Sequence, residues 1–350
     1  DTTVCPRDSV RFNAILTGRN YINYKWYVNN AYVGDSIINY KRPFISPGFY
    51  KIKVIITDDL QCQDSIVRNN YIFVSKPVAI LTGSPTNGCI PMTVNFTNST
   101  SITPGPGAGI ANKVWNFGVG GNVNIPGNTT SYTYNTRGIF DVKLMVIDSN
   151  GCTDTLVRSA YINARKPIAS FTVKDTACID EQLTFNNFSV NAVTAVWSFG
   201  DGGTSTNMNP TYRYKTKGNF TVRLIVTDSI GCKDTMTITN AVNIVKPDPS
   251  FTLSDSVAVC PPLFVRFTNT TPNASTYLWR TGLSTATTNN ASEFYTVKNK
   301  YDVTLIATDK YGCSDSTTRS VRILGYAGAF SYTPLNGCKP LDVYFTTITT

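Results

Sequence analysis

The sequence predicts an all-β fold, a linear array of antiparallel β-sandwich domains. Apolar and polar residues alternate in short segments, as from Phe220 to Val226, and a period of two marks a half-buried strand. Turns rich in Gly, Pro, Asn and Thr separate these segments, and no stretch shows helical periodicity. Repeats of about 80 residues, each with roughly seven short strands, are typical of β-sandwiches. The tryptophans mark the repeat, at positions 26, 115, 197 and 279.

The repeat divides the chain into five predicted domains. Every cysteine takes one of two places in it, either after the long strand or before an earlier one. The first repeat lacks the opening strand of its neighbours, so we expect a domain truncated at its N-terminus. The last repeat contains an opening only. The expected domains are residues 1–75, 76–164, 165–245, 246–324 and, as the opening strands of a truncated fifth domain, 325–350.

Individual strands follow from the same alternation. The long strand of the first domain is expected at 49–56, and in the second domain an opening strand at 79–81 precedes a strand at 94–96. The second domain also carries an enlarged loop at 104–109. In the third domain the glycines from 200 to 203 require a tight turn. The predicted core of that domain consists of Trp197, Phe199, Phe220, Val222, Leu224 and Val226.

The composition argues against catalysis. The chain has no histidine, its two glutamates are Glu181 and Glu293, and charged residues make up 15% of it. The commonest general base and the commonest metal ligand are therefore missing. We predict that the protein is not an enzyme and that it uses no cofactor.

The positively charged residues behind the net charge of +9 are distributed along the whole chain. Lys and Arg occupy alternating strand positions rather than runs, which indicates a solvated face and no nucleic-acid partner. No apolar run reaches the roughly 20 residues of a membrane-spanning helix, so we expect no direct membrane insertion. No signal peptide begins the chain, and Asp1 is expected to be an internal or processed start.

One motif in the third repeat resembles a known family. Trp197-Ser-Phe-Gly-Asp-Gly202, followed by Tyr212-Arg-Tyr and Gly218-Asn-Phe-Thr-Val-Arg-Leu224, is similar to the polycystic-kidney-disease (PKD) domain. The second repeat keeps Trp115-Asn-Phe-Gly but has Val119 in place of the turn aspartate. The resemblance implies seven-stranded, immunoglobulin-like sandwiches and an extracellular role as a spacer or in adhesion.

The style of the repeat resembles a second group. Tandem modules with Cys-x-Pro before one strand and Asp-x-x-Gly-Cys-x-Asp-Thr after another are similar to giant surface proteins of Bacteroidota, including gliding-motility adhesins exported by type IX secretion. This resemblance implies a cell-surface location. It also implies that the partners are neighbouring repeats of the same longer chain and, further, surface polysaccharide or other cell-surface proteins.

The cysteines are expected to form disulfides. Zinc or iron–sulfur sites would need Cys-x-x-Cys pairs or histidine, and the sequence has neither. Disulfides place the protein in an oxidising compartment outside the cytoplasm.

The immunoglobulin-like strand order bears on the pairing. It places the two cysteines of one domain at opposite ends of the sandwich, on the order of 30 Å apart, whereas a disulfide needs Cα atoms within about 7 Å. The expected bonds therefore join consecutive domains, and pairing within each domain stays open as the alternative. The expected pairs are Cys5 with Cys152, Cys89 with Cys232 and Cys178 with Cys313, and the partners of Cys62, Cys260 and Cys338 are expected outside these residues.

A second recurring motif is Asp followed by Ser or Thr after each post-strand cysteine. Ordinary turn chemistry explains it, since these side chains bond their own backbone at the start of a strand. The triplet is also similar to the O-glycosylation acceptor of Bacteroidota, which makes four hydroxyls candidates for glycans. They are Ser65, Thr155, Thr235 and Ser316.

Two further sites have weak support in the sequence. Asp201, with Asp180 and Glu181, could supply oxygen ligands to calcium, but no Asp-x-Asp-x-Asp loop is present and a lone turn aspartate usually caps backbone amides. We therefore predict no metal site. Trp197 and the tyrosines could form a sugar-binding platform, although aromatic residues in this pattern are core residues first.

Two functions remain open. The favoured one is a non-catalytic structural or adhesive surface protein, a stiff disulfide-bonded rod or filament segment. The alternative is a spacer, or a carbohydrate- or protein-binding repeat region, of a larger secreted hydrolase whose catalytic domain lies elsewhere.

Overall fold

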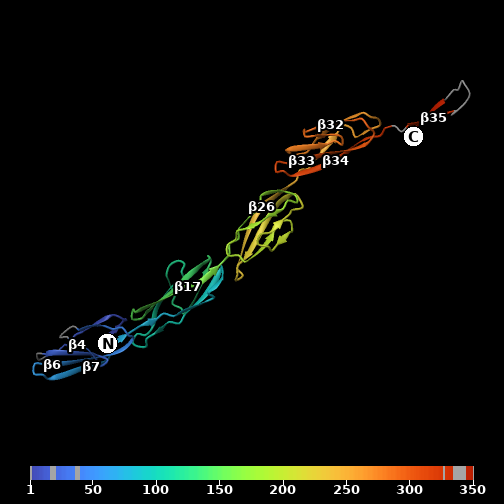
Figure 1. The fold of residues 1–350 in the computed structure, drawn as a ribbon. Coiled ribbons are helices and arrows are strands. Elements are labelled where there is room, and N and C mark those ends of the chain that lie inside the picture. The colour runs from blue at the N-terminus through green and yellow to red at the C-terminus, as the bar shows by residue number, and fades with distance from the viewer. Residues whose placement is uncertain (1, 16–20, 36–39, 326–327, 334–343, 350) are drawn as a thin grey trace. The chain divides into compact units, whose positions relative to one another are not determined.

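The protein is all-β. A computed structural model describes residues 2–15, 21–35, 40–325, 328–333 and 344–349, and these residues form strands and turns but no helix. Four β-sandwiches follow one another along the chain (Figure 1). They belong to two compact units, Asp1–Pro167 with Asp228–Lys233, and Ile168–Thr227 with Asp234–Thr350. The prediction of tandem β-sandwiches is confirmed.

Each sandwich contains a five-stranded sheet of the same order. Its last two long strands are antiparallel neighbours, and a short early strand pairs in parallel with the end of the last one. In the first sandwich this sheet has the order β1-β7-β6-β3-β4, and β2 pairs with β5. Its strands are β1 (Thr2–Val4), β2 (Ser9–Phe12), β3 (Tyr21–Val28), β4 (Ala31–Asp35), β5 (Tyr40–Pro43), β6 (Gly48–Asp58) and β7 (Gln63–Val74).

The second sandwich has the five-stranded sheet β10-β17-β16-β13-β14, the sheet β15-β11-β9 and the pair β12-β8. The expected opening strand at 79–81 is divided into two short strands, because the backbone N–H of Ala79 turns aside to donate to Asp154 Oδ2 at 2.8 Å. The strands are β8 (Pro77–Val78), β9 (Leu81–Ser84), β10 (Asn87–Cys89), β11 (Met92–Asn98), β12 (Ser101–Ile102), β13 (Ile110–Asn116), β14 (Val123–Asn124), β15 (Thr129–Tyr134), β16 (Gly138–Asp148) and β17 (Thr153–Arg165).

The third sandwich has the sheet β19-β26-β25-β22-β23 and the two-stranded pairs β18-β21 and β20-β24. The turn predicted from 200 to 203 separates β22 from β23. Gly200 is required there: its φ is +92°, and a Cβ would lie 2.5 Å from the carbonyl oxygen of Thr221. The strands are β18 (Phe171–Thr172), β19 (Thr176–Cys178), β20 (Leu183–Thr184), β21 (Asn186–Asn187), β22 (Thr194–Ser198), β23 (Thr204–Ser205), β24 (Thr211–Tyr212), β25 (Gly218–Thr227) and β26 (Lys233–Val245).

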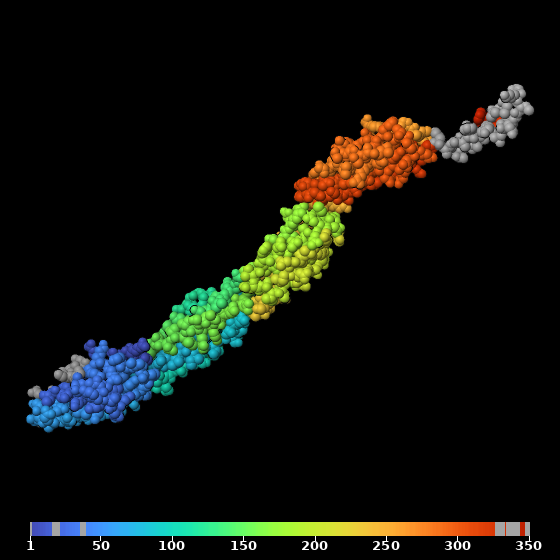
Figure 2. All heavy atoms as spheres, viewed as in Figure 1, coloured from blue at the N-terminus to red at the C-terminus, as the bar shows by residue number. Residues whose placement is uncertain are grey.

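The fourth sandwich has the sheets β28-β34-β33-β30-β31 and β27-β29-β32, and a last hairpin pairs β35 with β36. In the space-filling view its orange residues form one continuous body (Figure 2). The strands are β27 (Phe251–Leu253), β28 (Val257–Ala258), β29 (Leu263–Asn269), β30 (Thr276–Arg280), β31 (Thr285–Ala286), β32 (Ala291–Tyr295), β33 (Lys300–Thr308), β34 (Ser314–Ile323), β35 (Gly328–Thr333) and β36 (Tyr344–Thr349).

One tryptophan lies in each core. Trp115, Trp197 and Trp279 are completely buried, and Trp26 is 5% exposed. The core predicted for the third sandwich is buried as expected, except that Phe220 packs against its edge and is half-buried. Because Trp197 has no exposed surface, it cannot serve as a sugar platform.

A buried tyrosine fixes the end of the second sheet in three of the sandwiches. Tyr134, Tyr214 and Tyr295 each donate a hydrogen bond to a backbone carbonyl, at 2.9, 2.9 and 2.7 Å. Burial raises the pKa of all three phenols far above its ordinary value, so the hydroxyls remain donors at any physiological pH.

Candidate functional site at the junctions between sandwiches

Three disulfides join consecutive sandwiches. Their Cα–Cα distances are 5.3, 5.2 and 5.3 Å. In each, one cysteine lies at or just after the short parallel edge strand of a sandwich, and the other lies in the loop before the last strand of the next. This is the pairing expected from the immunoglobulin-like strand order, not the pairing within one domain. The bonds are Cys5–Cys152, Cys89–Cys232 and Cys178–Cys313.

The parallel edge strand positions the first cysteine of each pair. Cys89 lies opposite Arg165, the last residue of β17, and Cys178 lies opposite Val245, the last residue of β26. The chain leaves the sandwich at this point and enters the next one. The cysteine is therefore held beside the linker, where the loop of the following sandwich can reach it. This parallel pairing could not be predicted from the sequence, because strands of two or three residues are too short to show alternation.

An aspartate positions the second cysteine. In the loop before β17, Asp148 Oδ1 accepts the backbone N–H groups of Asn150 and Cys152 at 2.9 and 2.8 Å. Asp58, Asp228 and Asp309 hold their loops in the same way, through the N–H groups two and four residues later. The motif Asp-x-x-x-Cys is thus an Asx-type turn that presents the thiol.

The second oxygen of this aspartate contacts the linker from the preceding sandwich. At the first junction, Ser75 Oγ donates to Asp148 Oδ2 at 2.6 Å, and both residues are buried. Within the first unit, Arg165 Nε lies 3.5 Å from Asp228 Oδ2, and the Asp228 side chain is 1% exposed. A buried carboxylate without such a partner would carry a large desolvation cost.

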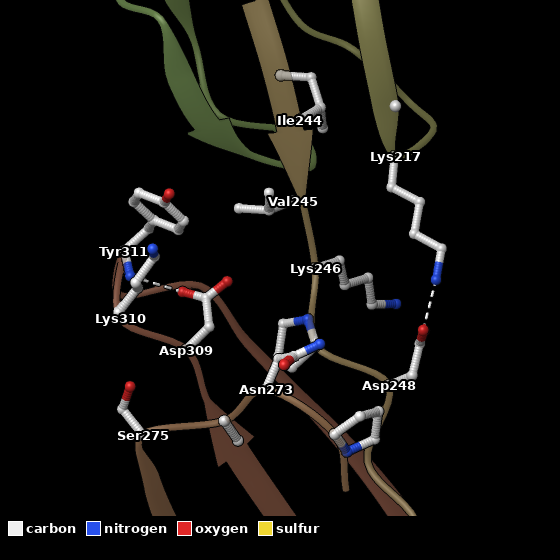
Figure 3. Close-up of a pocket in the computed structure, with 14 residues that line it drawn as sticks. Lys217, Ile244, Val245, Lys246, Asp248, Asn273, Ser275, Asp309, Lys310 and Tyr311 are labelled. Atoms are coloured by element: carbon white, nitrogen blue, oxygen red, sulfur yellow. Dashed lines mark hydrogen bonds and ion pairs between the residues drawn. The ribbon is translucent and has the colours of Figure 1, made fainter.

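The third junction differs from these two. The equivalent linker residue is Val245, which has no polar side-chain atom, and Asp309 is half-exposed. A cleft of about 680 Å³ opens beside it. Lys217 and Asp248 form an ion pair on one side of the cleft, while Asp309, Lys310 and Tyr311 lie on the other (Figure 3).

The enlarged loop at 104–109 adds a contact at the first junction. A Cβ on Gly105 would lie 2.3 Å from the ring of Phe73, so the loop backbone packs directly against this buried side chain of the first sandwich. Asn150 Nδ2 donates to the carbonyl of Pro106 at 3.3 Å and holds the loop in place. The extra residues of the second repeat thus cover a junction rather than form a flexible insertion.

The remaining cysteines are unpaired or outside the described residues. Cys62 and Cys260 are exposed and form no disulfide. Cys62 occupies the loop place of Cys152, and Cys260 occupies the edge-strand place of Cys89. Cys338 lies outside the described residues. The expectation that these three bond to further repeats stays a prediction.

The Asp-Ser/Thr motif has a structural role in the described residues. Asp154 Oδ2 accepts the N–H of Ala79 and Asp234 Oδ2 accepts that of Ala169, at 2.8 and 2.9 Å, while Asp315 forms an ion pair with Lys246 at 3.0 Å. These contacts tie the start of each sandwich to its last strand. The adjoining hydroxyl residues Ser65, Thr155, Thr235 and Ser316 are all exposed, so they remain accessible to modification.

The carboxylate of Asp201, the weak calcium candidate, accepts hydrogen bonds from groups of the protein. Its oxygens accept the N–H of Gly203 at 3.0 Å and the hydroxyl of Tyr212 at 2.9 and 3.0 Å. Burial, together with this hydrogen bond to Asp201, raises the pKa of the Tyr212 phenol. Asp180 pairs with Lys215, and Glu181 with Lys174. The described part of the chain has no group of three potential metal-binding side chains, and it contains no helix long and apolar enough to span a bilayer.

Comparison with known proteins identifies the repeat. The family model of the PKD domain matches residues 74–164 and 163–244. A microbial collagenase of Vibrio alginolyticus is 38% identical over 82 residues, which are 22% of this chain and 10% of the collagenase. The pre-pro-metalloprotease PrtV of Vibrio cholerae is 39% identical over 70 residues, which are 20% of this chain and 8% of PrtV. The chain thus spans a tenth or less of these curated relatives.

Two solved PKD domains are also similar to part of this chain. The PKD1 domain of Vibrio anguillarum Epp is 33% identical and covers 23% of this chain and 98% of its own, with a TM-score of 0.21. The PKD1 domain of Vibrio cholerae PrtV is 35% identical and covers 23% of this chain and 99% of its own, with a TM-score of 0.20. Residues 74–244 are thus matched by two consecutive copies of the PKD-domain model, and a microbial collagenase and a metalloprotease contain similar segments.

Proposed function

We propose that these residues form a stiff, non-catalytic spacer of an extracellular protein. The observation that supports this function is the disulfide from each sandwich to the next. Sandwiches on a single flexible linker usually hinge against one another. A second covalent connection beside the linker, with a hydrogen-bonded aspartate between them, opposes that motion. Disulfides persist in oxidising compartments, which supports the extracellular location.

The proposed domains are residues 1–75, 76–164, 165–245, 246–324 and the opening strands 325–350. Cys62, Cys260 and Cys338 would bond neighbouring repeats of a longer chain. The narrower proposal is a cell-surface adhesin of the gliding-motility type, exported by type IX secretion and carrying O-glycans on Ser65, Thr155, Thr235 and Ser316. It rests on the Asp-x-x-Gly-Cys-x-Asp-Thr repeat.

A second candidate is favoured by the sequence matches. The matched relatives are a collagenase and a metalloprotease, and only a small part of each resembles this chain. These residues could accordingly be the spacer region of a larger secreted hydrolase. The sequence on either side discriminates the two functions: further repeats support the surface protein, and a catalytic domain supports the hydrolase.

Small-angle X-ray scattering and negative-stain microscopy of the 350-residue chain test the stiffness. We expect the oxidised protein to show a narrow distribution of bend angles, and a variant with all six paired cysteines changed to serine to show a broad one. The control is C62S/C260S, which removes thiols that form no bond in the structure. Equal distributions for the oxidised protein and the six-serine variant would contradict the proposal.

A further inference from the structure

The outer face of the sheet β27-β29-β32 carries an exposed pair of phenylalanines. Phe264 and Phe294 lie directly opposite each other on β29 and β32, and opposite residues of antiparallel strands point to the same face. They are 48% and 52% exposed. Neighbouring exposed aromatic side chains mark an interaction surface more often than isolated ones do.

The other sandwiches show that the fold does not require this pair. Phe294 directly precedes the buried Tyr295. In the other three sandwiches, the residue that precedes the corresponding buried aromatic residue, and the residue opposite it, are small or polar. In the second sandwich the two threonines even bond each other, with their Oγ1 atoms 2.8 Å apart. In the third, Arg213 donates to Gln182 at 2.8 Å. The equivalent pairs are Ser9 with Pro43, Thr93 with Thr133, and Gln182 with Arg213.

An unpaired arginine adjoins the two rings. The guanidinium carbon of Arg266 lies 5.8 Å from the centre of the Phe264 ring, and no acidic side chain pairs with it among the described residues. The equivalent residue of the second sandwich is Asn95. A guanidinium that is exposed on an aromatic surface offers a planar, bidentate site for a carboxylate.

A shallow hollow of about 620 Å³ continues from this surface. Beyond the aromatic ring, its lining offers hydroxyl and amide groups. Asn290 Oδ1 accepts the N–H of Asn269 at 2.9 Å, which fixes the amide plane. The polar lining residues are Arg266, Thr268, Thr288, Asn290 and Ser292.

We propose that this face binds an acidic polysaccharide, a polymer of carboxylated hexose rings. A sugar ring has an apolar C–H face, which can stack on Phe264 and Phe294, and hydroxyls on its edge, which can bond the polar lining. Its carboxylate matches the unpaired Arg266. An apolar protein surface would cover the rings but leave the arginine and the hydroxyl and amide groups without partners. The inference does not depend on the stiffness of the chain.

Affinity electrophoresis of the 350-residue protein in gels that contain polygalacturonate or alginate tests this site, with neutral dextran as the reference polymer. We expect both acidic polymers, but not dextran, to retard the wild type. The variant F264T/F294T/R266N, which copies the face of the second sandwich, should bind at least tenfold more weakly. R266N alone should weaken binding and reduce its sensitivity to salt.

Two controls separate the site from general attraction to the basic protein. R11N removes an exposed arginine on the equivalent face of the first sandwich and should leave the retardation unchanged. The transplant T93F/T133F/N95R should restore retardation to the triple variant. Equal retardation of wild type and triple variant, absence of retardation by both acidic polymers, or self-association in sedimentation velocity that the triple variant abolishes would each overturn the proposal.

Discussion

Ser75 and Asp148 form a buried hydrogen bond between the first and the second sandwich, with Oγ donating to Oδ2 at 2.6 Å. The other oxygen of the same carboxylate holds the N–H of Cys152, whose sulfur is bonded to Cys5. One aspartate therefore connects the linker, the loop and the disulfide. We therefore expect the junction to behave as one cooperative unit rather than as two domains on a tether.

The first prediction concerns this hydrogen bond. S75A leaves a buried carboxylate oxygen without its donor, which typically costs about 1–3 kcal/mol. We expect the amides of residues 148–152 to exchange about tenfold to a hundredfold faster in hydrogen-exchange mass spectrometry. S65A, which truncates an exposed serine on β7, the strand that Ser75 follows, is the control and should leave these amides unchanged. Equal protection in S75A and wild type would show that the bond contributes nothing to the junction.

The second prediction concerns the disulfides. Peptide mapping without reduction should yield the three bonds between sandwiches and none within one. Each bond closes a loop of 147, 143 or 135 residues, for which the chain-entropy model gives about 5 kcal/mol, a value that strain in the folded state reduces. C178S/C313S should therefore lower the temperature at which the fourth sandwich unfolds. A map with Cys178 bonded to Cys232 would contradict the pairing.

The third prediction uses the exception at Val245. Its linker side chain offers Asp309 no polar partner, whereas Arg165 contacts Asp228 at the preceding junction. V245R should supply the missing contact and reduce the exchange of amides 309–313 severalfold. T239R adds the same charge at an exposed site on β26, away from the junction, and should have no such effect. If V245R and T239R reduce the exchange of amides 309–313 equally, the added positive charge, and not its place beside Asp309, causes the reduction.

The sequence predicted the sandwiches because their cores obey a strict period of two, and it predicted Trp197 and Leu224 as core residues for the same reason. The repeat predicted where in each domain the cysteines lie, and the direction of the strands predicted that they are bonded between consecutive domains. The partners of Asp148 and Asp228 could not be predicted, because Ser75 and Arg165 share no chemistry beyond the ability to donate a hydrogen bond. The exposed pair Phe264 and Phe294 was equally hidden, since alternation alone does not reveal which face of a strand is outside.

The fourth prediction concerns the turn at Gly200. G200A places a Cβ 2.5 Å from the carbonyl oxygen of Thr221 at a φ of +92°. Strain of this kind costs about 1–3 kcal/mol, so the amides of β25 should lose protection. Gly202 is a matched control: its φ is +98°, but no atom lies within 4 Å of its Cβ position. G202A should therefore destabilise β25 less, and an equal loss in both variants would assign the effect to φ alone.

The last prediction uses the two glutamates. Hydrogen bonds from Lys174 and from the N–H of Cys178 lower the pKa of Glu181. Burial would raise the pKa of Glu293, but hydrogen bonds from Ser284, Thr281 and the N–H of Phe294 outweigh it and lower the pKa. A lowered folded pKa means that each group stabilises the fold above its unfolded pKa, near 4.5. This stabilisation is lost as the pH falls through the folded pKa.

Selective ¹³C labelling of glutamate yields two carboxyl signals from this chain, because it contains two such residues. Both should titrate below the ordinary range. K174M should move the Glu181 titration upward and leave that of Glu293 in place, whereas S284A should do the reverse. If either substitution shifts both titrations, or neither shifts its own partner, then the named hydrogen bonds do not cause the lowered pKa values.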